Sequence, residues 1–119
     1  MHTVLVVDDT LFIRETIKRM VAGQGFEVIG EADNGEEAIR QYKKLNPDVV
    51  TMDITMPIKN GLEATKEIVA YDAEAKVVVI TAVDQQKNVV KALQNGAKDF
   101  MTKPFDQEKL LHVLYKQVD

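Results

Sequence analysis

Short apolar runs alternate along the chain with longer segments in which apolar residues recur at helical spacing. Runs of about five apolar residues are typical of strands, and recurrence every three or four residues is typical of an amphipathic helix. The expected strands are residues 3–7, 27–31, 49–52, 77–81 and 100–102. Their alternation with helices favours an α/β domain built around a parallel sheet.

The expected strands differ in how continuously apolar they are. Residues 4–7, 49–52 and 77–80 are almost entirely apolar, as expected for strands that helices cover on both faces. Residues 27–31 alternate more, which suits an edge strand. Right-handed crossovers would then place helices on both faces of a five-stranded sheet.

Five helices are expected between and after these strands. Asn34 is followed by Glu37 with the spacing of a capping box, and Asn60 with Glu63 repeats that signal. The expected inward-facing residues of the first, second, third and fifth helices are, in order, Ile13, Ile17, Met20 and Val21; Ala38, Tyr42 and Leu45; Leu62, Thr65, Ile68 and Val69; and Leu110, Val113, Leu114 and Val118.

The fourth and fifth helices are expected to begin at Asp84 and Asp106, because aspartate is a favoured N-cap. The fourth carries Val89, Val90 and Leu93 and is expected to stop at Gly96. Gly23 and Gly25 end the first helix in the same way, since glycine tolerates the left-handed backbone that follows many helices.

Length and composition restrict the class of protein. A chain of 119 residues, 45% hydrophobic and 29% charged, has the composition of one globular domain, expected over residues 1–119. The net charge of -4 argues against nucleic acid as the main partner, and the absence of cysteine excludes disulfides and thiolate metal sites. With no secretory leader and no apolar stretch long enough for a bilayer, the expected location is cytoplasmic, without a membrane partner.

Charged side chains directly follow three of the expected strands: Asp8 and Asp9 the first, Asp53 the third and Lys103 the fifth. The carboxyl ends of parallel strands meet at one crevice, so these residues are expected to form one site. Adjacent carboxylates repel each other unless a cation lies between them, and Mg²⁺ prefers such oxygen ligands. The pattern therefore predicts a metal and phosphoryl site, although each residue alone could be a helix cap or a solvated turn residue.

Chemistry can be assigned to several of these side chains. Asp53 could attack phosphorus and form an acyl phosphate, and the Lys103 ammonium could act as a point charge toward phosphate oxygens. Thr81 ends an apolar strand with a hydroxyl that could bond to a phosphoryl oxygen. Phe100 could be either a core residue or an aromatic switch that changes rotamer when Thr81 moves.

Five short sequences occur in an order that resembles a response-regulator receiver domain over essentially the whole chain. They are Val-Asp-Asp at 7–9, Met-Asp-Ile-Thr-Met-Pro at 52–57, Asn-Gly at 60–61, Ile-Thr-Ala at 80–82 and Lys-Pro-Phe at 103–105. The resemblance implies a flavodoxin-like (βα)5 fold, a doubly wound parallel sheet with strand order 2-1-3-4-5. It also implies phosphorylation of Asp53.

The resemblance further implies a ligand set for Mg²⁺. Asp9 and Asp53 would bind the ion directly, Asp8 would act largely through water, and the backbone carbonyl of Thr55 would complete the protein ligands. Thr55 and Val83 are expected to flank the site, and Val83 can neither orient nor activate water. Hydrolysis of the phosphoryl group is therefore expected to be slow relative to receivers with an acidic or amide side chain there.

The resemblance also implies how the switch works. Thr81 and Lys103 would hold the phosphoryl oxygens, and Phe100 would take the aromatic switch position. The best-known chemotaxis version has a tyrosine there. Phe100 lacks its hydroxyl, so any coupling by rotation would act through packing.

The implied function is a signalling switch, not a conventional enzyme. A sensor histidine kinase would phosphorylate it, a phosphatase could act on it, and residues 51–57 resemble chemotaxis regulators of the CheY type, with a protein target such as the flagellar motor switch. The alternatives are a relay intermediate that serves a histidine phosphotransfer protein, and a receiver excised from a longer regulator. A flavodoxin-type cofactor binder or a small magnesium phosphohydrolase is disfavoured, because no phosphate-cradling loop follows the first strand.

Overall fold

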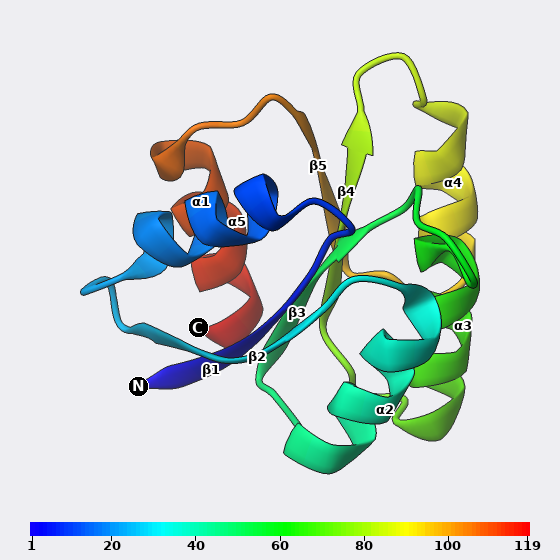
Figure 1. Cartoon of the computed structure of the whole chain (residues 1–119), viewed down its shortest axis with the longest axis horizontal. Helices are drawn as coiled ribbons and strands as arrows, with labels where there is room; N and C mark the ends of the chain where they lie inside the picture. The colour runs from blue at the N-terminus through cyan, green and yellow to red at the C-terminus, as the bar shows by residue number, and fades with distance from the viewer.

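The computed structural model describes residues 1–119 as five strands that alternate with five helices (Figure 1). All five expected strands are confirmed to within one residue at each end. In chain order the elements are β1 (His2–Val7), α1 (Leu11–Val21), β2 (Phe26–Ala32), α2 (Gly35–Leu45), β3 (Val49–Asp53), α3 (Gly61–Tyr71), β4 (Val77–Ala82), α4 (Lys87–Gln94), β5 (Asp99–Lys103) and α5 (Gln107–Val118).

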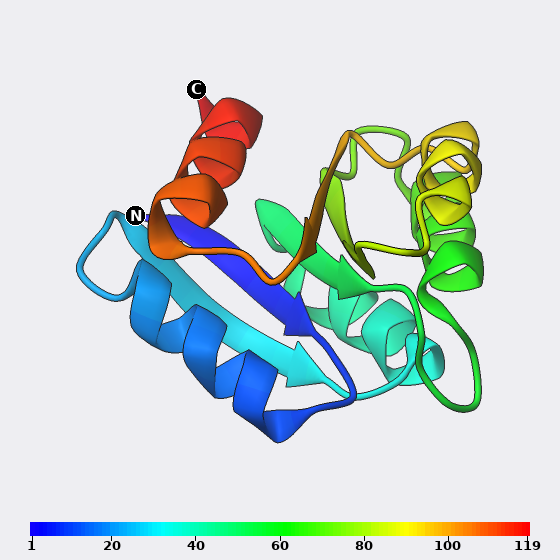
Figure 2. The same cartoon turned by 90° about the horizontal axis from the view of Figure 1, so that it is seen from above.

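The strands form one parallel sheet in the order β2-β1-β3-β4-β5. Helices α1 and α5 cover one face, and α2, α3 and α4 cover the other (Figures 1 and 2). This order is that of the flavodoxin-like fold, as predicted. None of the helices is both long and apolar enough to cross a membrane.

Two hydrophobic cores lie on opposite faces of the sheet, because successive strand side chains point to opposite sides. Val4 and Val6 of β1 belong to the core beneath α1 and α5, whereas Leu5 and Val7 belong to the core beneath α2, α3 and α4. Strands β1, β3 and β4 supply both cores, which explains their nearly continuous apolar sequences. The more polar β2 is an edge strand, as expected.

Three of the expected helix caps are confirmed. The side chains of Asn34 and Asn60 accept hydrogen bonds from the backbone N–H groups three residues later, at 2.9 Å in both cases. Asp106 caps α5 in the same way. The first capping box is incomplete, because the Glu37 carboxylate pairs with Arg40 and Gln41 within α2.

The expectation for the start of α4 is wrong. The helix begins at Lys87, and Asp84 lies before it in a turn closed by the Gln85 N–H bond to the Ala82 carbonyl. The helix also buries fewer of its apolar side chains than a core helix would. Val89 and Ala92 face the sheet, whereas Val90 and Leu93, one position further around the helix, are exposed.

Candidate functional site

Three charged side chains converge where the strands end. Asp8 follows β1, while Asp53 and Lys103 are the last residues of β3 and β5. Strand alternation places them on one face: Asp8 lies two residues beyond Val6, and Lys103 two residues beyond Met101, both in the core beneath α1 and α5. Sequence positions up to 95 residues apart therefore meet at one point, where Lys103 bonds to Asp8.

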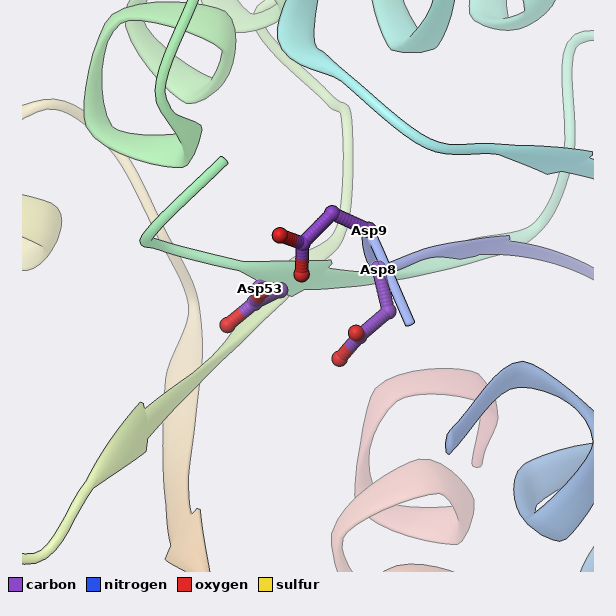
Figure 3. Close-up of side chains that lie close together, drawn as sticks. All are labelled: Asp8, Asp9 and Asp53. Atoms are coloured by element: carbon purple, nitrogen blue, oxygen red, sulfur yellow. The ribbon is translucent and has the colours of Figure 1, made fainter. Parts of the chain in front are cut away.

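The acidic residues form a cluster suited to a cation. Asp8, Asp9 and Asp53 each offer a carboxylate oxygen, and these oxygens lie within 4.8 Å of one another (Figure 3). Asp8 and Asp53 are buried, whereas Asp9 is exposed. An oxygen-only donor set that is open on one side matches the preference of Mg²⁺ for a few carboxylates together with water. The predicted metal-ligating aspartates are thus brought together.

Lys103 lies between the two buried carboxylates, with its Nζ 3.0 Å from Asp8 Oδ2 and 3.4 Å from Asp53 Oδ1. Burial lowers the pKa of Lys103, but the hydrogen bond to Asp8 and the charge of Asp53 outweigh it, so the pKa is raised overall. The side chain therefore remains an ammonium. The Lys103–Pro104 peptide bond is cis.

Asp53 is held in an environment that disfavours its charge. Burial, followed by the negative charge of Asp8, raises the pKa of Asp53 to about 6, although Lys103 opposes both effects. A buried carboxylate whose charge is disfavoured is stabilised more by a bound cation, or by conversion to a covalent adduct, than a carboxylate in water would be. A perturbed pKa in a polar crevice is also typical of a functional group.

Asp8 is held in place because each of its backbone and side-chain polar groups makes a hydrogen bond. Its N–H donates to the Ala32 carbonyl at 3.0 Å, and its Oδ1 accepts from the Thr10 N–H at 2.9 Å. Its carbonyl oxygen accepts from Arg14 Nη1 at 2.7 Å. The roles of Thr10 and Arg14 at the site were not expected from the sequence. Both bonds involve backbone groups, the N–H of Thr10 and the carbonyl of Asp8, and these are not specified by residue type. The available signal was weak: a basic residue near the start of the helix that follows two aspartates.

The family model of the response regulator receiver domain matches residues 4–115. The chain belongs to the response regulator receiver family. It is 50% identical over 113 residues to the chemotaxis protein CheY of Thermotoga maritima, covering 95% of this chain and 94% of that protein. With the CheY of Bacillus subtilis the identity is 46% over 118 residues, covering 99% and 98%.

Comparison with solved structures also supports membership of this family. A crystal structure of a CheX–CheY–BeF3–Mg²⁺ complex from Borrelia burgdorferi matches with a TM-score of 0.93 and 36% identity, covering 99% of this chain and 90% of that one. This receiver is therefore of the CheY type, a phosphorylation switch of chemotaxis signalling rather than a conventional enzyme. Its acidic cluster is typical of a phospho-accepting site.

The loop after Asp53 leads from β3 to α3. Thr55 lies in it and is exposed, and its far end is anchored by the bond from the Gly61 N–H to the Ile54 carbonyl at 2.8 Å. A Cβ at position 61 would lie 2.1 Å from the Asp53 carbonyl oxygen, so only glycine fits there. The Asn-Gly sequence at 60–61 thus combines a helix cap with a close approach to Asp53.

Thr81 and Phe100 lie toward the opposite side of the sheet from Lys103. Thr81 is buried and directly follows Ile80, which pairs with Asp53 across β3 and β4. Phe100 is 40% exposed and borders a cavity of about 340 Å³ between α4 and β5. Phe100 is therefore not a core residue in this structure. The cavity beside its ring is also lined by Val89 and Val90.

Proposed function

We propose that residues 1–119 act as one receiver domain that accepts a phosphoryl group on Asp53 from a phosphohistidine of a sensor kinase. The observation that carries the proposal is the buried Asp53 carboxylate, flanked by two further aspartates and 3.4 Å from the Lys103 ammonium. Phosphorylation would change the affinity of the domain for a protein target in chemotaxis. A cytoplasmic location fits this role.

In the transfer step, an Asp53 carboxylate oxygen attacks phosphorus in line with the bond to the histidine nitrogen. The new O–P bond forms an acyl phosphate as the N–P bond breaks, and the departing imidazole nitrogen keeps the electron pair. Lys103 lies where its ammonium can bond to an oxygen of the transferred group and offset its charge. Water later cleaves the acyl phosphate.

The donor set of the pocket fits Mg²⁺. Asp9 and Asp53 would bind the ion directly, together with the Thr55 carbonyl, and when bound it would supply positive charge to the phosphoryl oxygens. Both carboxylate oxygens of Asp8 already accept bonds, from Thr10 and Lys103. This supports a role for Asp8 through water. The Borrelia burgdorferi complex contains Mg²⁺, which supports Mg²⁺ as the ion for this pocket.

The response to phosphorylation would pass through Thr81 and Phe100. A phosphoryl group adds charge and strong acceptor oxygens, which would draw the Thr81 hydroxyl toward Asp53. The movement would free space for the Phe100 ring, which borders the cavity beside α4. The phosphoryl group stabilises the active arrangement by its additional contacts and so shifts an existing equilibrium.

The flagellar motor switch is the target most consistent with the CheY relatives, which carry the name chemotaxis protein. A phosphorelay role is the main alternative, and a receiver belonging to a longer regulator is another. Binding of a flagellar switch peptide that strengthens on phosphorylation supports the chemotaxis role. Return of the phosphoryl group to a phosphotransfer histidine supports the relay. The Borrelia burgdorferi CheY was solved in complex with CheX, which supports a protein partner for the receiver, and a phosphatase is proposed as a further partner.

The phosphoacceptor is tested by incubation with acetyl phosphate and Mg²⁺, followed by intact mass measurement. Wild type is expected to gain one phosphoryl group, and Asp53→Asn none. Asp84→Asn is the matched control, because Asp84 is exposed and outside the cluster, and it should label like wild type. Labelling of Asp53→Asn at the wild-type level would refute the assignment of Asp53.

A further inference from the structure

Arg14 of α1 joins the metal-ligating segment to the edge of the sheet. Its Nη1 donates to the Asp8 carbonyl at 2.7 Å, and its Nε donates to Glu31 Oε1 of β2 at 3.0 Å. The side chain is only 16% exposed. A guanidinium can make two such bonds in fixed directions because it is planar and rigid, which an ammonium cannot do.

The partner of Arg14 is itself held in place. Glu31 Oε2 accepts from Lys18 Nζ at 2.9 Å, and Lys18 also pairs with Glu15 at 3.1 Å. The hydrogen bond from Lys18, with a contribution from Arg14, lowers the pKa of Glu31 despite its partial burial. Glu31 therefore stays ionised, and the guanidinium is braced between α1 and β2.

The Asp9 side chain makes few interactions that would fix its position. Its carboxylate is exposed, and the bond it accepts from a neighbouring side chain is a long one, 3.4 Å from the Thr10 hydroxyl. Its position therefore follows from the orientation of the Asp8–Asp9 peptide. The oxygen of that peptide is the Asp8 carbonyl, the atom that Arg14 binds.

We propose that Arg14, braced by Glu31, is a positioning residue that orients the Asp8–Asp9 peptide and so places the Asp9 carboxylate for Mg²⁺. This inference rests on the proposed function, since it assigns the ion to the same pocket. A positioning role and a purely electrostatic role of Arg14 predict opposite effects of its removal on Mg²⁺ affinity. A cation near the pocket repels Mg²⁺, so charge alone predicts that removing Arg14 tightens binding of the ion. Positioning predicts that it weakens binding, as loss of an outer partner of a metal ligand usually does.

The test is a titration with Mg²⁺ alone, followed by amide chemical shifts in NMR spectra of the folded protein. Arg14→Gln is expected to weaken Mg²⁺ binding by about tenfold. Arg14→Lys keeps the charge but cannot make both bonds, so its affinity should fall between those of wild type and Arg14→Gln. The matched control is Arg19→Gln on the same helix, because the one side-chain hydrogen bond of Arg19 is to Thr16 and none reaches the Asp8–Asp9 segment. It should bind Mg²⁺ at least as tightly as wild type.

A second measurement separates positioning from loss of stability. The initial rate of labelling by acetyl phosphate is measured against Mg²⁺ concentration. Arg14→Gln should need about tenfold more Mg²⁺ for half of its maximal rate but should approach the wild-type rate at saturation. Equal or tighter Mg²⁺ binding by folded Arg14→Gln would overturn the inference while leaving the proposed function intact. If Arg14→Gln does not fold, wild-type affinity in Arg14→Lys overturns it. Failure of wild type to label would instead overturn the proposed function.

Discussion

Replacing Asp53, the proposed phosphoacceptor, should stabilise the fold. The Asp53 carboxyl has a pKa of about 6 in the folded protein against 3.8 for an unperturbed group, because burial and the charge of Asp8 disfavour ionisation. At about 1.4 kcal/mol per pH unit, keeping this group charged at pH 7 costs the folded state about 3 kcal/mol, or about 2 after allowing for screening by nearby water. Asp53→Asn removes that cost and should raise the free energy of unfolding at pH 7 by this amount.

The sign of the pH dependence follows from the direction of the shift. Because the folded pKa is raised, the folded state binds this proton more tightly, so the contribution of Asp53 to wild-type stability becomes more favourable as the pH falls from 7 through about 6 toward 4. The advantage of Asp53→Asn should shrink over the same window and nearly vanish at pH 4.

The assay is urea unfolding followed by circular dichroism, at several pH values in EDTA. Asp84→Asn serves as the control for losing a carboxylate, since Asp84 is exposed. Equal stabilities of wild type and Asp53→Asn at pH 7, or an advantage that does not depend on pH, would refute the reasoning.

Three further substitutions test separate parts of the structure. Lys103→Met leaves the Asp8 side chain, 1% exposed, without its ammonium, so the free energy of unfolding should fall by about 3 kcal/mol in urea titrations; an unchanged value would contradict the pairing. Ile58 is 79% exposed with a φ of 69°, a left-handed conformation that β-branched residues avoid. Ile58→Asn should therefore stabilise by about 1 kcal/mol in thermal unfolding, whereas Val83→Asn, at an exposed site without positive φ, should not. Val83 lies two residues beyond Thr81 and cannot activate water, so Val83→Glu should shorten the lifetime of phosphorylated Asp53 severalfold, as measured by intact mass. No acceleration would exclude this position from control of hydrolysis.

Much of the fold could be read from the chain because burial on both faces imposes a simple pattern on strands. Residues 49–52 and 77–80 are continuously apolar since helices cover both of their sides. The charges at strand ends could be assigned to one site for a related reason, because parallel strands direct their carboxyl ends to one edge. Asp53 and Lys103, predicted from that rule, lie 3.4 Å apart.

The errors lie where local signals compete with packing. Asp84 has the residue type of a cap, but a turn bond from Gln85 to Ala82 delays the start of α4 to Lys87. On that short helix, apolar side chains at Val90 and Leu93 are exposed because only one edge of it meets the sheet. Periodicity gives the presence of the helix, and its rotation against the sheet depends on neighbours distant in sequence.

The sequence by itself determined the architecture, the order of the strands through the receiver resemblance, and the residue types gathered at the crevice. These follow from alternation of burial and from the direction of parallel strands. Only the tertiary structure decided how each charge is partnered: that Lys103 lies between Asp8 and Asp53, and that Arg14 binds the Asp8 carbonyl. The partners of a long, flexible side chain depend on which groups the fold brings within its reach. Backbone carbonyls occur at every residue, so the sequence does not indicate which of them accepts a side-chain hydrogen bond.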